Sequence, residues 1–389
     1  MPLPNHPDPT QQPAPASSDE RPLILDTHAD TAQRFADEAW SFSDPLQGGH
    51  LNLASARIGN LAGEIFAIWP EPTQWRGRYA HRTLQLIDSV LEQVRRAPGQ
   101  LQLCTSADEI LAARAGGRFA VLMGIEGGHA IENSLALLRA YFHLGVRYMT
   151  LTWANSNDWA TSSGDLDAPS GRHHGLSQFG HDVIREMNRL GMIVDVSHSS
   201  DATLADVLAA SRAPILATHS SARALTNSPR NLTDDQLRAI AAAGGAIMVN
   251  FYSAFISETY RQTLNALKPE RDLAHRVLVD EYAVRCEPIP YRLSNEIDRQ
   301  FASRIPRPPL SALIDHIDHI ARTAGVDCVG IGTDFDGISA LPEGIDSTAD
   351  LPRVFEALRS RGYTPVELQK ISGGNLLRVF REVASAASI

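Results

Sequence analysis

The chain has 389 residues, of which 43% are hydrophobic and 21% are charged. This composition provides enough apolar side chains for a sizeable core and excludes a chain that is disordered throughout. The formal net charge of −10 argues against a general nucleic-acid-binding protein, although it leaves room for a local basic patch. The cysteines lie far apart without a C-x-x-C spacing, which argues against a disulfide framework or a thiolate zinc site and favours buried or idle thiols at Cys104, Cys286 and Cys328.

Residues 1–22 are rich in Pro, Gln, Ser and Asp and contain neither a positively charged start nor an apolar stretch. They are predicted to be a disordered leader rather than a signal peptide. No part of the sequence approaches the ~20 consecutive apolar residues of a membrane-spanning helix. The simplest expectation is a cytoplasmic protein that does not associate with a membrane.

Short apolar runs that begin at residue 23 are predicted to be β-strands. Most of them are uniformly apolar, as in Ala-Ile-Met-Val-Asn-Phe at 246–251, which is typical of parallel strands covered on both faces. The eight predicted strands are 23–28, 64–69, 119–125, 146–152, 192–197, 214–219, 246–251 and 328–333.

Helical patterns lie between these runs. Ser177–Leu190 has apolar residues at helical spacing and is followed by Gly191, a residue suited to the C-terminal end of a helix. Thr233–Ala243 opens with Thr-Asp-Asp-Gln, which resembles a capping box. The alternation of eight strands with helices predicts a (β/α)8 TIM-like barrel, with a doubly wound open sheet as the alternative.

Residues 253–308 interrupt the alternation after the seventh predicted strand. They carry Tyr, Arg and Glu at helical spacing and end in the breaker-rich Arg-Ile-Pro-Arg-Pro-Pro. We expect an inserted helical cap, which at this position lies on the active-site face of a barrel. Residues 23–389 are otherwise predicted to form one domain.

Ionisable side chains follow five of the predicted strands, at the end where barrel active sites gather. Considered alone, each of these residues is more often an ordinary hydrogen-bonded residue than a metal ligand. Their placement together at the same end of the barrel favours a shared cavity. Three imidazoles with carboxylates suit divalent ions such as Zn²⁺, and they exceed the needs of one tetrahedral ion, so two bridged ions fit better. The residues are His28, Asp30, Glu126, His198, His219 and Asp334.

Five motifs resemble those of the membrane dipeptidase (renal dipeptidase) family of zinc peptidases. In chain order they are Asp-Thr-His-Ala-Asp, Ile-Glu-Gly-Gly-His, Asp-Val-Ser-His, Thr-His-Ser-Ser and Gly-Thr-Asp-Phe-Asp-Gly, and the similarity runs from about residue 24 to 380. The resemblance implies a binuclear-zinc hydrolase on a barrel related to the amidohydrolases. It also implies a homodimer as one possible assembly, because many family members are dimers.

The resemblance also implies a ligand set for two Zn²⁺ ions. His28 and Asp30 would hold the first ion, Glu126 would bridge both, and His198 and His219 would complete the second. His129 and Asp336 lie beside ligand motifs and are expected to brace the ligands or their loops rather than to bind metal.

The substrate-handling residues are assigned in the same way. Asp334 would act as general base and then as general acid. Arg230, in Ser-Pro-Arg-Asn, would hold the free carboxylate of the substrate, since a guanidinium meets a carboxylate with two parallel hydrogen bonds.

One position departs from the family pattern. Family members commonly read Leu-Thr-His after the fourth strand, whereas this chain reads Leu-Thr-Trp, which places Trp153 where that histidine polarises the scissile carbonyl. An indole can donate one hydrogen bond but cannot take up a proton or carry a charge. We expect oxyanion stabilisation to be weaker, to move to Asn155 or Asn157, or to rest mainly on the metals. Packing of Trp153 against the cavity wall is the structural alternative.

The resemblance therefore implies a metal-dependent dipeptidase that uses a metal-bridging hydroxide. Because family members tolerate a D-residue at the C-terminal position, it also implies that such dipeptides are candidate substrates. Trp153 and the insert at 253–308 motivate a second hypothesis, a hydrolase of another small amide, a lactam or an N-acyl amino acid. A third hypothesis is a metal-binding protein without turnover.

Overall fold

The computed structural model describes residues 23–165 and 174–388. The leader predicted for residues 1–22 lies outside the described residues. The parallel strands of the central sheet pair in the order in which they follow one another along the chain: β1 (Ile24–Ala29), β2 (Leu61–Ile68), β4 (Phe119–Glu126), β5 (Val146–Thr150), β6 (Ile193–Asp195), β7 (Leu216–Ala217), β8 (Ala246–Val249) and β9 (Val329–Ile331). These match the eight predicted strands. The short β3 (Leu101–Leu103), which the sequence did not indicate, pairs with β4 outside this ring.

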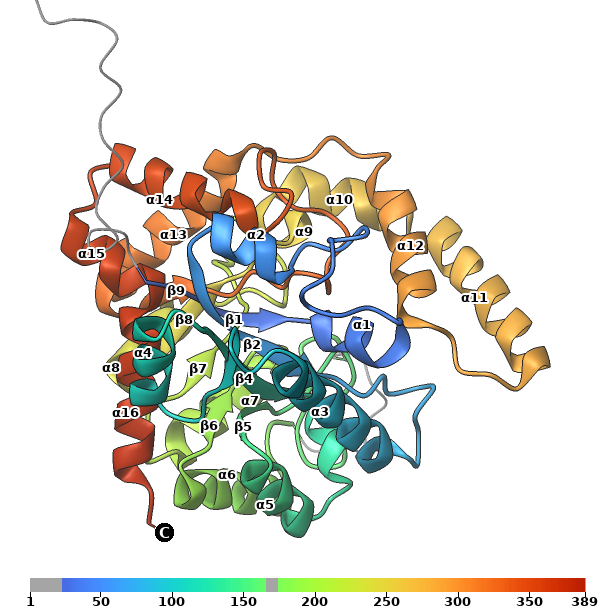
Figure 1. Cartoon of the computed structure of the whole chain (residues 1–389), viewed down its shortest axis with the longest axis horizontal. Coiled ribbons are helices and arrows are strands. Elements are labelled where there is room, and N and C mark those ends of the chain that lie inside the picture. Colours follow the sequence, from blue (N-terminus) through green and yellow to red (C-terminus); the bar gives the residue numbers. More distant parts are fainter. Residues whose placement is uncertain (1–22, 166–173, 389) are drawn as a thin grey trace, which may run out of the picture.

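The ring closes between its first and last strands. Asp334 N donates to His28 O at 3.0 Å, and Asp30 N donates to Phe335 O at 2.8 Å, so the segment that follows β9 is joined to β1. A doubly wound sheet would instead reverse its strand order at a switch point. The prediction of a (β/α)8 barrel is therefore confirmed (Figure 1).

Helices surround this ring. Both predicted helix starts are confirmed: Ser177 caps α6 by accepting from Gly180 N, and Thr233 opens α8 with a complete capping box. Gly191 ends α6 in the left-handed conformation, with φ of 73°. The α-helices outside the insert are α1 (Thr31–Asp37), α2 (Leu53–Ile58), α3 (Tyr79–Arg96), α4 (Ala107–Ala115), α5 (Leu135–His143), α6 (Gln178–Leu190), α7 (Asp201–Ala210), α8 (Asp234–Ala242), α13 (Leu310–Ala324), α14 (Leu351–Ser360), α15 (Pro365–Gln369) and α16 (Asn375–Ala386). Shorter helical turns are η1 (Gly128–Ile131), η2 (Val326–Cys328), η3 (Thr348–Asp350) and η4 (Lys370–Gly374).

The insert between β8 and α13 is helical, as predicted. It contains α9 (Ser253–Ile256), α10 (Glu258–Ala266), α11 (Lys268–Arg285) and α12 (Tyr291–Ala302). Figure 1 shows α11 and α12 at the margin of the molecule, beyond the ring of strands. No residue of α11 is buried, so this helix is held by its neighbours on one side only.

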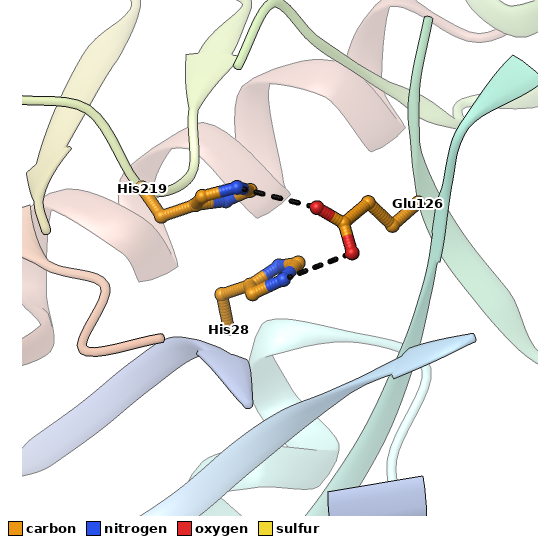
Figure 2. Close-up of side chains that lie close together, drawn as sticks. All are labelled: His28, Glu126 and His219. Atoms are coloured by element: carbon orange, nitrogen blue, oxygen red, sulfur yellow. Dashed lines mark ion pairs between the residues drawn. The ribbon is translucent and has the colours of Figure 1, made fainter. Parts of the chain in front are cut away.

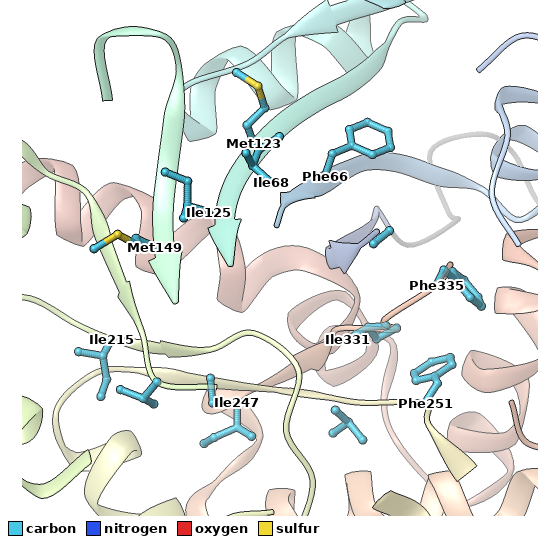
Figure 3. Close-up of a cluster of buried hydrophobic side chains, with 14 of the residues drawn as sticks. Phe66, Ile68, Met123, Ile125, Met149, Ile215, Ile247, Phe251, Ile331 and Phe335 are labelled. Atoms are coloured by element: carbon cyan, nitrogen blue, oxygen red, sulfur yellow. The ribbon is translucent and has the colours of Figure 1, made fainter. Parts of the chain in front are cut away.

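The core fills the space between the strands and the outer helices. Every residue of β2 and of β4 is buried, and apart from Glu64 and Glu126 their sequences are apolar, as expected for parallel strands covered on both faces. Figure 3 shows part of this packing, with Phe66, Met123, Ile247 and Phe335 among its members. Among the described residues, no helix combines the length and apolar character needed to cross a membrane.

Candidate metal centre and active site

The structure brings the predicted metal-ligand residues together at one end of the barrel. Each lies at or just beyond the carboxyl end of a strand, since β1, β4, β6 and β7 all point toward the same opening. This clustering follows from the parallel barrel, which gathers residues distant in sequence at one rim. The residues are His28, Asp30, Glu126, His198 and His219, and Asp334 joins them from the loop after β9.

Glu126 occupies the centre of the cluster. Its Oε1 lies 2.9 Å from His198 Nε2 and 3.5 Å from His219 Nε2, while its Oε2 lies 3.5 Å from His28 Nε2. Figure 2 shows the carboxylate facing both His28 and His219, with one oxygen directed toward each ring. One carboxylate thus presents an oxygen to each of two groups of imidazoles, which is the arrangement that a bridging ligand requires.

A second group of ligand atoms lies on the His28 side. His28 Nε2 is 3.8 Å from Asp30 Oδ2, and one ligand atom each from His28, Asp30 and Asp334 lie within 4.8 Å of one another. The same holds for His28, Glu126 and His219. The two groups share His28, so the candidate ligand atoms form one continuous cluster.

The electrostatics of the cluster call for added positive charge. Asp30, Glu126 and Asp334 are each at most 9% exposed. Burial, together with the charge of Glu126, raises the pKa of Asp30 well above its ordinary value. Burial lowers the pKa of His28, but Glu126 and Asp30 outweigh that effect and raise it to about 10. A divalent cation would supply the missing charge to these crowded carboxylates.

The hydrogen bonds of the imidazoles leave the correct nitrogens for a metal. His28 Nδ1 lies 2.8 Å from Tyr148 Oη, and His219 Nδ1 lies 2.8 Å from Thr218 Oγ1. The Nε2 atoms of both rings therefore face the cluster, and His28 Nε2 is buried without a hydrogen-bond partner in the described part of the chain. A metal-binding imidazole is usually held in this way through its second nitrogen. The residues present fit a divalent metal centre.

Gly124 makes room for the group that orients His28. A Cβ atom at Gly124, on β4, would lie 2.1 Å from Tyr148 Cζ, which no packed structure accommodates. Tyr148 is fully buried and reaches across from β5 to the His28 ring. The Met-Gly-Ile order in β4 is thus a requirement of the site as well as of the sheet.

Two buried aspartates hold the strand ends that carry His219 and Asp334. Asp195 accepts hydrogen bonds from both Thr218 N (2.9 Å) and Thr218 Oγ1 (2.7 Å). Asp26 accepts from Thr333 N at 2.8 Å and from the hydroxyl of Thr333 in the same way. Each threonine directly precedes a site residue, so each Asp–Thr pair fixes the backbone from which that residue projects.

Asp334 is placed by a strained backbone and by an amide. Its φ is +63°, in the left-handed region that non-glycine residues rarely adopt, and such strain is common at functional sites. Asn250 Nδ2 donates to Asp334 Oδ2 at 2.8 Å. Burial raises the pKa of Asp334 above its ordinary value, as suits a group that exchanges protons near neutral pH. His198 shares the left-handed conformation, with φ of +65°.

Arg230 lies beside the cluster, in the loop between β7 and α8. Its Nη2 donates to His219 O at 3.1 Å, and its guanidinium carbon lies 5.3 Å from the centre of the Phe255 ring. Its Nε is buried without a hydrogen-bond partner. Burial lowers the pKa of Arg230 to about 10, which leaves the side chain charged at neutral pH. It therefore offers a cation with an unused donor.

Trp153 stands at the cavity wall, whereas the two asparagines do not. Its ring centre is 4.7 Å from that of Trp69 and 6.2 Å from that of His198. The amide of Asn157 is used within its own loop. Its Nδ2 donates to Leu151 O, and its Oδ1 accepts from two peptide N–H groups. Neither Asn155 nor Asn157 is among the described residues that line the cavity.

The two residues expected to brace ligand loops do make such contacts. His129 Nε2 lies 2.8 Å from Pro70 O, which ties the turn after β4 to the loop after β2. Asp336 accepts from Thr31 Oγ1 at 2.7 Å and from His50 N at 2.7 Å. Both side chains hold loops that carry ligands.

The cluster lies at the floor of a cavity of about 610 Å³. Its wall combines site residues, aromatic rings from several loops, and side chains of the insert helices α11 and α12. The site residues on this wall are Asp30, Glu126, Trp153, His198, Arg230 and Asp334.

Several supporting residues escaped the sequence reasoning. Tyr148 and Thr218 look like ordinary strand residues, and only the fold shows that they orient imidazoles. Asp195 and Asp26 did carry a signal: each is an acidic residue inside an otherwise apolar run. A buried carboxylate needs partners, so these positions were readable as hydrogen-bond centres.

Comparison with known proteins agrees with this architecture. The family described as "Membrane dipeptidase (Peptidase family M19)" matches residues 18–388. Dipeptidase 3 of Mus musculus is 35% identical over 342 residues, which cover 86% of this chain and 58% of the mouse protein. The match to Dipeptidase 3 of Rattus norvegicus covers 59% of that protein. This chain thus spans less than two thirds of the length of these curated relatives.

Solved structures resemble the chain over almost all of its length. The crystal structure of the probable dipeptidase PvdM from Pseudomonas aeruginosa has a TM-score of 0.78 and 28% identity, and it covers 95% of this chain and 97% of that chain. A metallo peptidase from Rhodobacter sphaeroides, bound to a phosphinate mimic of the dipeptide L-Ala-D-Ala, has a TM-score of 0.74 and 25% identity, with 93% and 99% coverage.

Proposed function

Because this chain belongs to the membrane dipeptidase family, we propose that it is a zinc-dependent dipeptidase. The observation that carries the proposal is the carboxylate of Glu126 between three imidazoles, with Arg230 and Asp334 at the rim of the same cavity. The dipeptide mimic bound to the Rhodobacter sphaeroides relative supports a substrate of two residues, including those with a D-residue at the C-terminal position.

We assign the ligands as the family resemblance implies, and the distances within the cluster support this assignment. His28 and Asp30 would hold one ion, His198 and His219 the other, and Glu126 would give one oxygen to each. Two bound divalent ions would polarise the scissile carbonyl and lower the pKa of a bound water to near neutrality. The imidazoles of His28 and His219 keep their Nε2 atoms turned toward the cluster through the hydrogen bonds of their Nδ1 atoms.

Asp334 is the proton-transfer group of the proposal. Its Oδ2 accepts the hydrogen bond of Asn250, which leaves Oδ1 to take a proton from the attacking water and to pass it to the leaving amine. The raised pKa of the buried carboxyl brings it closer to the working pH, where such a group transfers protons best.

Arg230 is the carboxylate-binding group. Its buried Nε has no hydrogen-bond partner among the described residues, and the desolvated guanidinium would meet the substrate's C-terminal carboxylate with a charge-assisted pair of hydrogen bonds. If Arg230 must bind the substrate's C-terminal carboxylate, longer peptides would be excluded. Their next residue would lie where the carboxylate of a dipeptide binds.

Trp153 gives a reason to keep a second candidate function. It places an indole, which cannot take up a proton or carry a charge, next to His198. A substrate with a less demanding carbonyl, such as a strained lactam, another small amide or an N-acyl amino acid, would depend less on a donor at this position.

A substrate panel tests the proposal. The metal-loaded chain and a chelated sample are compared on free dipeptides, on the same dipeptides with amidated C-termini, and on lactams and N-acyl amino acids. Metal-dependent hydrolysis of free dipeptides, lost on amidation, supports the proposal, and the Arg230→Ala variant should raise KM for free dipeptides only. Turnover restricted to the other amides supports the second candidate, and two bound ions without any turnover indicate a metal-binding protein.

A further inference from the structure

The insert helix α11 forms part of the cavity wall above the metal centre. Leu278, Val279 and Tyr282 of α11 line the cavity, and the adjoining Ile289 continues the same wall. A cavity of about 610 Å³ is within the range that holds drug-sized ligands, so it is large for a substrate of two small residues. The wall leaves room for a bulky side chain.

Aromatic rings from the barrel loops complete this part of the cavity. Trp69, in the loop after β2, lies 4.7 Å from Trp153 and 6.1 Å from Tyr291, measured between ring centres. All three rings line the cavity. Flat aromatic surfaces contribute large apolar contact areas and favour offset or edge-on contact with another ring.

Four ionisable side chains at the cavity wall are committed to one another. Arg82 makes a two-pronged pair with Asp37 at 2.8 Å, and His275 Nε2 lies 3.1 Å from Asp298 Oδ1. A charged substrate side chain would have to break one of these pairs to bind any of the four. Together with the aliphatic and aromatic residues of the wall, this favours an apolar side chain.

The α11 wall is fastened to the barrel at its far end. Gln74 accepts from Ile289 N at 2.7 Å and donates to Ile289 O at 3.3 Å. These two bonds tie the connection between α11 and α12 to the loop that also carries Trp69. The apolar side chains of the insert and the aromatic rings of the barrel are thereby held as one surface.

We propose that this surface, made of Leu278, Val279, Tyr282, Trp69 and Trp153, selects dipeptides whose amino-terminal residue is large and apolar, such as Leu or Phe. The inference rests on the proposed dipeptidase function. A dipeptide with its carboxylate at Arg230 and its scissile carbonyl at the metal centre leaves the amino-terminal side chain to contact the remaining wall. Val279 is 51% exposed, so a substrate side chain that covers it removes apolar surface from water.

The test compares two α11 variants on matched substrates. Tyr282→Ser removes a ring from the cavity wall, and because no residue of α11 is buried, the change should leave the fold intact. Val284→Ser is the control, since Val284 lies on the same helix, is 86% exposed and is not part of the wall. The substrates are Gly-D-Ala, Leu-D-Ala and Phe-D-Ala, with Ala-Gly and Ala-D-Phe to vary the other end.

The wild type should show a kcat/KM for Phe-D-Ala and Leu-D-Ala at least about 10-fold above that for Gly-D-Ala, the scale at which pockets discriminate apolar groups. Tyr282→Ser should reduce that ratio several-fold, mainly through KM, while Val284→Ser keeps it. Hydrolysis of all three substrates at similar rates overturns the inference and leaves the proposed function standing. An equal loss on Gly-D-Ala, or a changed preference at the C-terminal residue alone, also overturns it. If the metal-loaded wild type cleaves no dipeptide, the proposed function fails and the inference fails with it.

Discussion

The hydroxyl of Thr218 should control how tightly the centre holds its metal. Its Oγ1 lies 2.8 Å from His219 Nδ1 and donates to Asp195 Oδ2 at 2.7 Å. Metal binding through Nε2 forces the proton of His219 onto Nδ1, where Thr218 receives it. In Thr218→Val that proton is buried without an acceptor whenever a metal is bound, because His219 is fully buried.

The metal-free variant escapes this cost. Its His219 can carry the proton on Nε2 and donate toward Glu126, whose Oε1 lies 3.5 Å away. The penalty of an unsatisfied buried donor, about 1–3 kcal/mol, therefore falls on the metal-bound state alone. This corresponds to a loss of roughly 10- to 100-fold in metal affinity, the usual worth of a group that orients a ligand.

Competition with a chromophoric chelator measures that loss. Thr150→Val is the matched control, since Thr150 also donates its hydroxyl to Asp195 Oδ2 and is also fully buried, but its hydroxyl bonds no imidazole among the described contacts. The control should change Zn²⁺ affinity by less than about threefold, within the ordinary effect of a neutral hydrogen bond. Equal affinities for the two variants would refute the reasoning, and thermal melts in chelator would show whether either variant is misfolded.

Three further changes have defined outcomes. Asp334→Asn should retain both metals by elemental analysis and lose roughly 10²–10⁴-fold in kcat; near-normal turnover would move the proton-transfer role elsewhere. Trp153→His should raise kcat on simple dipeptides by up to about 10²–10³-fold, the worth of one oxyanion donor, unless another group already polarises the carbonyl. Glu64→Gln should stabilise the metal-free protein at pH 8 but not at pH 4. Burial, followed by the charge of Asp26, raises the pKa of Glu64 well above its ordinary value, so the wild type loses stability as the pH rises above the unfolded-state pKa, by at most about 1.4 kcal/mol per pH unit. Urea unfolding across that range measures the difference, and a pH-independent difference would contradict it.

The ligands were predictable because their chemistry is conspicuous in the sequence. His28, Glu126 and His219 are polar residues at the ends of apolar runs, and a parallel barrel gathers such ends at one rim. The barrel itself followed from the same alternation. The composition of the cavity wall was not predictable, because α11 reaches the site only through contacts such as that between Gln74 and Ile289, which are 215 residues apart.

The observed strands β6 and β7 are shorter than predicted, and the reason lies in the site. Apolar character continues to Val196 and begins again at Pro214, so sequence alone favours strands over 192–197 and 214–219. In the structure the carboxylate of Asp195 accepts from the peptide N–H groups of Ser197 and Thr218, which replaces the backbone pairing that would continue the strands.

Because the strand pairing ends at Asp195, the backbone that follows can place His198 in the site. A regular strand would alternate its side chains between core and barrel interior, and it would hold His198 at negative φ. With the pairing transferred to a side chain, the backbone turns through the left-handed conformation at His198, φ +65°, and His198 reaches Glu126 at 2.9 Å. Asp26 does the same for Thr333 at the β1–β9 seam, and Asp334 follows there with φ of +63°. At both places a buried aspartate ends the strand pairing just before a site residue. Replacing Asp195 or Asp26 with an apolar residue of similar size should therefore extend the strand pairing and move His198 or Asp334 away from the site.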